Sequence, residues 1–117
     1  MPRDVYHYFQ QACRRKLEPV VAPLSIVASD DAQAGFLLRL GSGGHIESVE
    51  YRCTTCMTLV ALCEHVAERL RGVSLDHARS LRADDLLRQH PEIPLSRQSR
   101  AHLAVAAARA AMENLPT

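Results

Sequence analysis

The sequence predicts one α+β domain over residues 1–117, in which a three-stranded antiparallel sheet is covered on one face by helices. Three observations support this prediction. Extended, β-branched segments are confined to the first half of the chain, the second half carries helical periodicity, and a glycine-rich run at 41–44 indicates a hairpin. Strands followed by helices in this order are typical of the α+β class. At 117 residues the chain is long enough for a hydrophobic core.

The first half of the chain is expected to contain one helix and three strands. An amphipathic helix is predicted over 4–13, with Asp4 as its cap. Strands are predicted over 24–29, over 36–40, and from 46 to the cysteine pair that follows Arg52. Consecutive strands joined by short turns predict an antiparallel meander.

The second half is expected to be helical. A long helix is predicted from the cysteine pair to about Gly72, with one apolar stripe formed by Leu59, Leu62, Cys63, Val66 and Leu70. Glu64 and His65 are expected on its opposite, charged face together with Glu68 and Arg69. Shorter helices are predicted over 74–80 and 83–89, and a final alanine-rich helix over 99–114.

Composition narrows the classes of function. The formal net charge is +1, with 23% charged and 47% hydrophobic residues, as in an ordinary globular protein. Aromatic residues make up 4% and tryptophan is absent, so a nucleic acid partner is not expected. No segment has the apolar length of a signal peptide or a membrane span. We therefore expect a cytoplasmic protein without a membrane partner and, in the absence of nucleophile and phosphate-loop motifs, without enzyme activity.

Cys53 and Cys56 form the strongest candidate site. They lie where the third predicted strand gives way to the long helix, and the unpaired N–H groups of a helix start favour thiolate over thiol. Two cysteines in this spacing can approach within the roughly 4 Å that shared metal ligation requires. Three interpretations stay open: metal or cluster binding completed by another chain, dithiol redox chemistry, and a structural pair.

The other two cysteines are expected to act as small hydrophobic side chains. Cys63 belongs to the apolar stripe of the long helix, and Cys13 follows Phe9 at helical spacing. The histidines, His65 and His90 among them, are expected in solvent rather than in a metal site. In a reducing compartment none of the cysteines is expected to form a structural disulfide.

Three segments of the chain carry a resemblance to a known family. They are IESVEYRCTTC at 46–56, GVSLDHARSLRADDL at 72–86, and IPLSRQSRAHLA at 93–104. Together they resemble the U-type iron–sulfur cluster scaffold family, which comprises NifU N-terminal domains, IscU and SufU. The resemblance covers residues 25–115 and implies a SufE/NifU-like fold, with Cys56 as the counterpart of the family's central cysteine.

Most of the family's cluster ligands have no counterpart in this chain. The family surrounds its cluster with three cysteines, an aspartate near the first, and often a histidine beside the third. The first cysteine would fall near Asp30, while the histidine and third cysteine fall on Ser99 and Arg100. The resemblance therefore implies a variant scaffold that binds iron, zinc or an iron–sulfur cluster through a reduced ligand set, Cys56 and Cys53.

Two other functions are left open by the residues. One is a cluster-free binding module, in which Ser99 and Arg100 mark a docking surface instead of a lost metal site. The other is a small dithiol oxidoreductase that uses Cys53 and Cys56. The resemblance implies a cysteine desulfurase or a client iron–sulfur protein as the partner, and the oligomeric state stays open.

Overall fold

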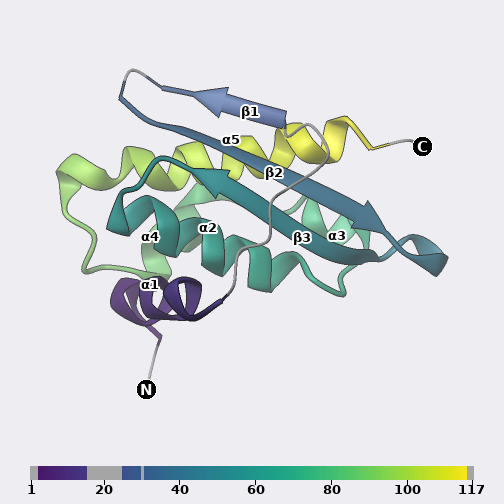
Figure 1. The fold of residues 1–117 in the computed structure, drawn as a ribbon, viewed down its shortest axis with the longest axis horizontal. Coiled ribbons are helices and arrows are strands. Elements are labelled where there is room, and N and C mark those ends of the chain that lie inside the picture. The colour runs from purple at the N-terminus through teal and green to yellow at the C-terminus, as the bar shows by residue number, and fades with distance from the viewer. Residues whose placement is uncertain (1–2, 16–24, 30, 116–117) are drawn as a thin grey trace.

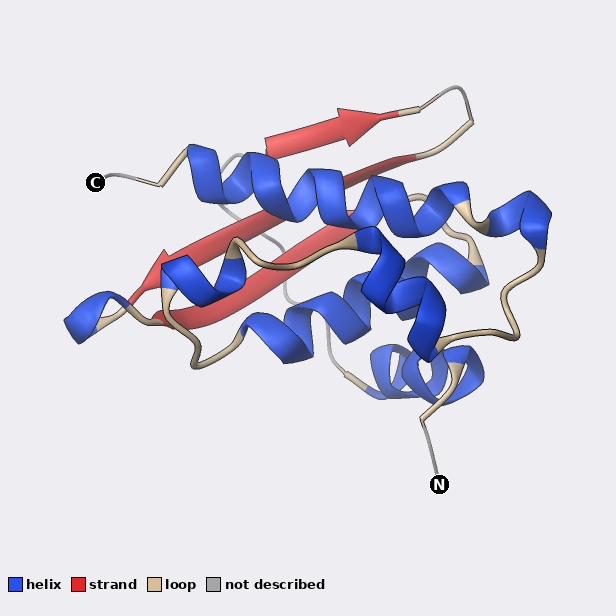
Figure 2. Ribbon diagram, turned by 180° about the vertical axis from the view of Figure 1, so that it is seen from behind, coloured by secondary structure: helices blue, strands red, loops and turns tan. Residues whose placement is uncertain are grey.

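A three-stranded antiparallel sheet forms one layer of the protein, with the strands in the order β1-β2-β3. The strands are β1 (Ser25–Ala28), β2 (Gln33–Leu40) and β3 (Ile46–Cys53). The computed structural model describes residues 3–15, 25–29 and 31–115. Its helices lie on one face of the sheet, as Figures 1 and 2 show from opposite sides. The α+β class predicted from the sequence is confirmed.

The central strand β2 pairs antiparallel with both of its neighbours. It begins at Gln33 rather than at the expected residue 36, because Ala34 and Gly35 find partners on both β1 and β3. The register places Cys53 directly opposite Ala34, and Ala34 is buried with 1% exposure. Directly opposed residues share a face of the sheet, so Cys53 lies on the face that the helices cover.

Two long helices form the second layer. Helix α2 (Met57–Leu70) packs against β3, while α5 (Ser99–Glu113) packs against β1 and β2 and also contacts α2. Their buried side chains form the core together with those of the sheet. The fully buried members include Phe36, Ile46, Leu59, Leu62, Val66 and Ala104.

Three shorter helices complete the architecture. Helix α1 (Val5–Arg14) packs against α2, and α4 (Ala83–Gln89) packs against α5. The N-terminus of α1 is capped as expected, because the Asp4 carboxylate accepts a hydrogen bond from the His7 N–H at 2.8 Å. Helix α3 (Leu75–Ala78) is a single turn.

A glycine ends helix α2 and turns the chain back to the sheet. Gly72 has φ +82°, a left-handed conformation that glycine adopts without the steric cost of a side chain. Its N–H donates to the Ile46 carbonyl at 2.8 Å, and the Ile46 N–H donates to the Val73 carbonyl at 2.8 Å. The end of α2 is therefore tied to the start of β3.

Several expectations about burial are wrong. Glu64 and His65 were expected on a charged, exposed face of α2, yet their exposures are 0% and 5%. The error arises because α1 packs against α2 and covers side chains that lie outside the apolar stripe of that helix, Glu64 among them. His90, expected in solvent, is 2% exposed, whereas Cys13, expected in the core, is exposed.

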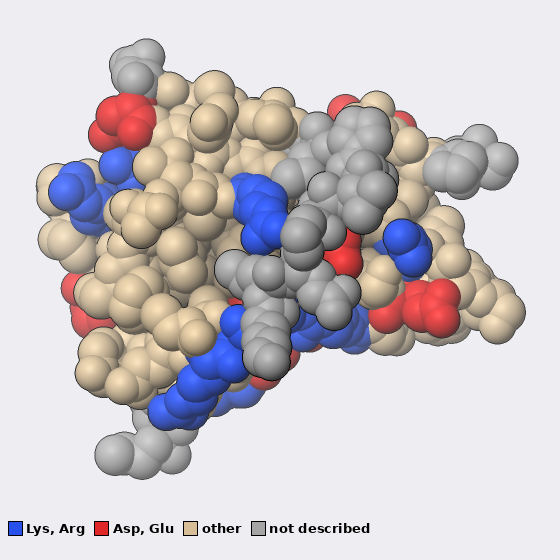
Figure 3. Space-filling model, viewed as in Figure 1, with Lys and Arg blue, Asp and Glu red and all other residues tan. Residues whose placement is uncertain are grey.

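Two expected features lie outside the described residues. Asp30, near which the first cysteine of the resembled family would fall, is one of them, and position 24 at the start of the first predicted strand is the other. No helix within residues 3–15, 25–29 and 31–115 combines the length and apolar character needed to cross a bilayer. Basic and acidic side chains are interspersed over the face shown in Figure 3, in keeping with the formal net charge of +1.

Candidate functional site

Cys56 occupies the N-cap position of α2, immediately after β3 has ended. Its backbone is extended, with φ −140° and ψ 124°, and its carbonyl accepts a helical hydrogen bond from the Val60 N–H at 2.8 Å. The side chain is partly exposed. The backbone therefore holds this sulfur at the surface, at the positive end of a helix dipole, as the sequence predicts.

The surroundings of Cys56 favour its thiolate. Burial is the strongest single influence and raises the pKa, but it is outweighed by the Leu59 N–H, by the Arg100 side chain and by the Thr58 N–H, so the pKa lies below its ordinary value. The sulfur does not complete a capping hydrogen bond of standard geometry, and the two N–H groups act on it through their proximity. A lowered pKa makes the thiol more nucleophilic at neutral pH.

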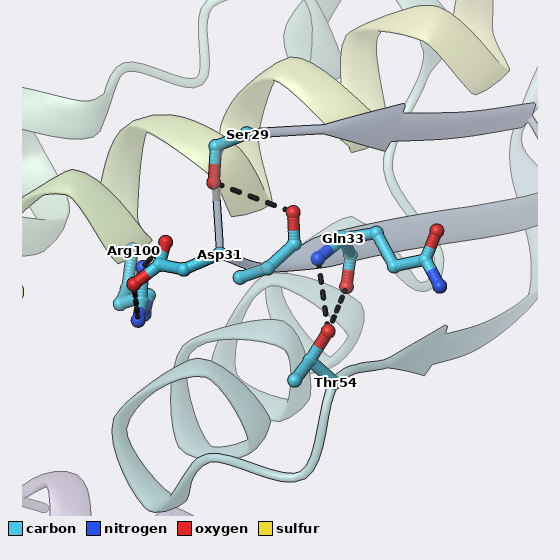
Figure 4. Close-up of polar contacts among 6 residues, drawn as sticks. Ser29, Asp31, Gln33, Thr54 and Arg100 are labelled. Carbon is cyan, nitrogen blue, oxygen red and sulfur yellow. Dashed lines mark hydrogen bonds and ion pairs between the residues drawn. The ribbon is translucent and has the colours of Figure 1, made fainter.

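Arg100 links Cys56 to an acidic side chain of the neighbouring turn. It lies in the first turn of α5 with 7% exposure, and its Nη1 and Nη2 donate to the two carboxylate oxygens of Asp31 at 3.0 Å each. Figure 4 shows the Asp31 side chain directed at the guanidinium. These hydrogen bonds lower the pKa of Asp31, while Asp31 first and Cys56 second raise the pKa of Arg100. The guanidinium of Arg100 therefore stabilises the charged forms of both the Asp31 carboxyl and the Cys56 thiol.

Two turns are fastened to the start of β2 and fix the positions of these groups. Ser29 donates from its N–H and from its hydroxyl to the Ala32 carbonyl, at 2.7 and 3.3 Å, and so closes the turn that carries Asp31. Thr54 Oγ1 accepts from the Gln33 N–H at 2.9 Å, on the turn between the two cysteines. Both contacts are visible in Figure 4. The turn that carries Asp31 and the turn that precedes Cys56 are thus both hydrogen-bonded at the start of β2.

Cys53 makes its thiol contact with Cys63 of α2. Both lie between the sheet and the helix layer, and the expected burial of Cys63 is confirmed at 0% exposure. The hydrogen bond between the two thiols lowers the pKa of Cys53 and raises that of Cys63, and burial raises the latter further. All four cysteines are free thiols. The structure therefore pairs Cys53 with a buried partner on the helix, while Cys56 faces Arg100.

The described side chains do not fit a resident metal ion or cluster. Within residues 3–15, 25–29 and 31–115, no group of three or more His, Cys, Asp or Glu side chains is arranged to hold a metal ion. A tetrahedral site needs about four donors. Near Cys56 the carboxylate of Asp31 is already engaged by Arg100 at 3.0 Å, which supplies the positive charge. The expected ligation of iron, zinc or a cluster by Cys56 and Cys53 has no support in this geometry.

Sequence reasoning missed a buried carboxylate beneath α1. Glu64 accepts hydrogen bonds from Tyr51 Oη at 2.8 Å, Gln11 Nε2 at 2.8 Å and Arg15 Nη2 at 2.7 Å. Burial, reinforced by Glu64, raises the pKa of Tyr51. The apolar periodicity of α2 does not reveal that Glu64 is buried, because the side chains that donate to Glu64 come from β3, from α1 and from the residue after α1.

A histidine pair on the same side of α2 was also missed. His65 Nδ1 lies 2.7 Å from His90 Nε2, and His90 Nδ1 lies 3.3 Å from Glu92 Oε2. When His90 donates from Nδ1 to Glu92, its Nε2 can accept the proton of His65 Nδ1. Burial, followed by the nearby His90, lowers the pKa of His65 to about 4. His65 also stacks on Tyr8 at 4.2 Å, so the pair fastens α1 to α2 and to the end of α4.

Comparison with known proteins assigns no family to the chain. No protein-family model matches it, and no curated protein sequence matches it significantly. We therefore infer the function of the chain from the geometry around Cys56 and from the motif resemblance.

Proposed function

We propose that the protein takes part in iron–sulfur cluster assembly as a cluster-free variant of the U-type scaffold fold, which docks a cysteine desulfurase and accepts its sulfur on Cys56. The observation that carries the proposal is the partly exposed Cys56 thiol at the start of α2, whose pKa Arg100 and two N–H groups lower. The motif resemblance supplies the class of partner. The arrangement of strands and helices agrees with the fold that the resemblance implies.

The chemistry asks only for a nucleophilic thiolate. Cys56 attacks the outer sulfur of a persulfide on the desulfurase, the sulfur–sulfur bond of the donor breaks, and the donor cysteine leaves as a thiolate. The outer sulfur keeps its proton or charge, so the products are a persulfide on Cys56 and a free donor thiolate. No external electron acceptor and no metal ion are required.

A dithiol oxidoreductase is less well supported by the contacts. Such an enzyme needs two cysteines that meet each other and are both reached by a substrate. Here the thiol partner of Cys53 is Cys63, which has 0% exposure, and Cys56 is oriented toward Arg100 instead. This arrangement favours a single reactive sulfur.

Exposed apolar side chains lie near this sulfur and suit a protein partner. Met57 directly follows Cys56 with 49% exposure, and Leu95 has 83% exposure in the short turn that leads into α5. The starts of α2 and α5 lie at the same end of the molecule (Figure 1). Because contiguous exposed apolar patches mark protein interaction sites, we take Met57 and Leu95 as the candidate docking residues.

The decisive experiment is transfer of sulfur from a purified cysteine desulfurase. The reduced protein is incubated anaerobically with the desulfurase and L-cysteine, and the added sulfur is located by peptide mass spectrometry. We expect one added sulfur on Cys56, none in Cys56→Ser, and full loading in the matched control Cys13→Ser, because Cys13 is exposed but remote from a helix start. Sulfur on other cysteines only, or none at all, contradicts the proposal.

Metal analysis tests the alternative ligand role. The anaerobically purified protein and its Cys56→Ser variant are assayed for iron, zinc and acid-labile sulfide, before and after incubation with iron and sulfide. We expect substoichiometric metal in both. Stoichiometric metal that disappears in Cys56→Ser would instead favour the reduced ligand set, Cys56 and Cys53.

Docking is tested separately from chemistry. We expect Met57→Asp and Leu95→Asp to slow sulfur transfer from the desulfurase, with no effect on loading by sodium polysulfide, a small chemical source of the same sulfur. Tyr6→Asp on α1 is the matched control, since Tyr6 is 58% exposed and lies on another element. Equal transfer rates in all three variants would exclude Met57 and Leu95 from the docking surface.

A further inference from the structure

One nitrogen of the Arg100 guanidinium is buried without a hydrogen-bond partner. Nη1 and Nη2 each donate one hydrogen bond to the Asp31 carboxylate, but Nε is buried and has no hydrogen-bond partner within the part of the chain that the structure describes. A buried donor without an acceptor costs about 1–3 kcal/mol. Buried polar groups without a partner are rare in native proteins and call for an explanation, one of which is a functional state that supplies the acceptor.

The other buried donor of this kind has a local explanation. Nε of Arg15 also has no hydrogen-bond partner among the described residues, but the guanidinium of Arg15 lies 5.7 Å from the centre of the Tyr51 ring, whose π face attracts a cation. Arg100 instead lies beside the sulfur of Cys56 and acts on it as a donor. The unused donor of Arg100 is thus next to the proposed reactive group.

Resting on the proposed function, we propose that Arg100 is a positioning residue whose Nε–H donates to the outer sulfur of a persulfide on Cys56. That sulfur lies one bond of about 2.05 Å beyond the Cys56 sulfur, and its anionic form is a strong acceptor. The bidentate contact with Asp31 fixes the plane of the guanidinium, so its Nε–H keeps one direction while sulfur is loaded and delivered. Asp31 thereby acts on the sulfur only through Arg100.

Substitutions of Arg100 can distinguish the effect of its positive charge from the effect of its directed Nε–H donor. Lysine offers the same positive charge as arginine but no planar fork, so Arg100→Lys retains the electrostatic help to the Cys56 thiolate and loses the directed Nε donor. Arg100→Gln loses both. Asp31→Asn leaves the guanidinium in place but removes the charge that orients it.

The test loads each variant with sodium polysulfide, which needs no docking, and follows two readouts. The first is the pH profile of Cys56 alkylation by iodoacetamide. The second is the lifetime of the Cys56 persulfide toward a small thiol, followed by mass spectrometry. Circular dichroism verifies that each variant is folded, and if Arg100→Gln does not fold, the comparison of Arg100→Lys with the wild type decides.

We expect Arg100→Gln to shift the alkylation profile to higher pH and to shorten the persulfide lifetime about tenfold, the effect of losing one hydrogen bond to a charged group. Arg100→Lys should restore the alkylation profile but not the lifetime. Equal lifetimes in the wild type and Arg100→Lys overturn the assignment of Arg100, even though Cys56 still accepts sulfur. If the wild type gains no sulfur on Cys56 from polysulfide or from the desulfurase, the proposed function and this inference both fail.

Discussion

The substitution Glu64→Ala tests whether the buried carboxylate of α2 holds α1 to the rest of the protein. Glu64 is 0% exposed and accepts three hydrogen bonds, from Tyr51, Gln11 and Arg15. Tyr51 belongs to β3 and Gln11 to α1, and Arg15 directly follows α1. Removing the carboxylate therefore leaves donors without an acceptor at the point where three elements meet.

The cost follows from how well each donor can be rehydrated. Tyr51 is 5% exposed, so its hydroxyl stays unsatisfied at a cost of about 1–3 kcal/mol. The side chain of Arg15 is 34% exposed and regains water, so its loss counts for about 1 kcal/mol or less. The one buried methylene group that the substitution removes, Cγ of Glu64, adds about 0.8 kcal/mol, while relief of the desolvated charge offsets part of the loss. We expect a loss of about 3 kcal/mol in the free energy of unfolding.

Urea denaturation at neutral pH, followed by far-UV circular dichroism, measures this loss. The matched control is Glu50→Ala on β3, because the Glu50 side chain is exposed and substitutions at such surface positions usually change stability by about 0.5 kcal/mol or less. The double variant Tyr51→Phe with Glu64→Met removes both polar partners and should be more stable than the sum of its single changes predicts. A loss in Glu64→Ala no larger than in Glu50→Ala would refute the reasoning.

Three further predictions concern α2 and its neighbours. The folded protein holds the pKa of His65 at about 4 against an ordinary 6.5, so the unfolded chain binds the proton more readily. The free energy of unfolding should therefore fall by up to about 3 kcal/mol between pH 6.5 and 4, and by less in His65→Phe. Urea denaturation across that pH range measures the fall. Cys63→Ser should destabilise the protein by about 1–3 kcal/mol through burial of a hydroxyl, a loss that thermal denaturation measures against an unchanged Cys13→Ser. Mild oxidation with diamide should link Cys53 to Cys63, and peptide mapping that finds Cys53 joined to Cys56 would contradict the thiol contact described above.

Elements with strong local signals were predicted closely. Helix α4 has the expected bounds, and α5 begins at the expected Ser99, because proline breaks before it and alanine-rich composition within it are local properties. The start of β2 was missed, since strand pairing by Ala34 and Gly35 depends on neighbours in space rather than on their own propensity.

The residues of the candidate site likewise divide into those predicted from local signals and those that depend on contacts between distant elements. The place of Cys56 at the start of a helix follows from the change of hydrophobic period along the chain, and the burial of Cys63 follows from its position in an apolar stripe. The burial of Glu64 and His65 does not follow from that stripe, because it depends on where α1 docks.

By itself the sequence determined the order of strands and helices and the exposure of one sulfur at a helix start, because both depend on neighbours within a few residues. Only the tertiary structure decided which groups meet that sulfur. Arg100 and Asp31 lie 69 residues apart in the chain, and Cys53 reaches Cys63 through the register of β3 against β2 and the packing of α2 on the sheet. Such contacts arise when separate elements close onto a common core, so no local pattern of residues encodes them.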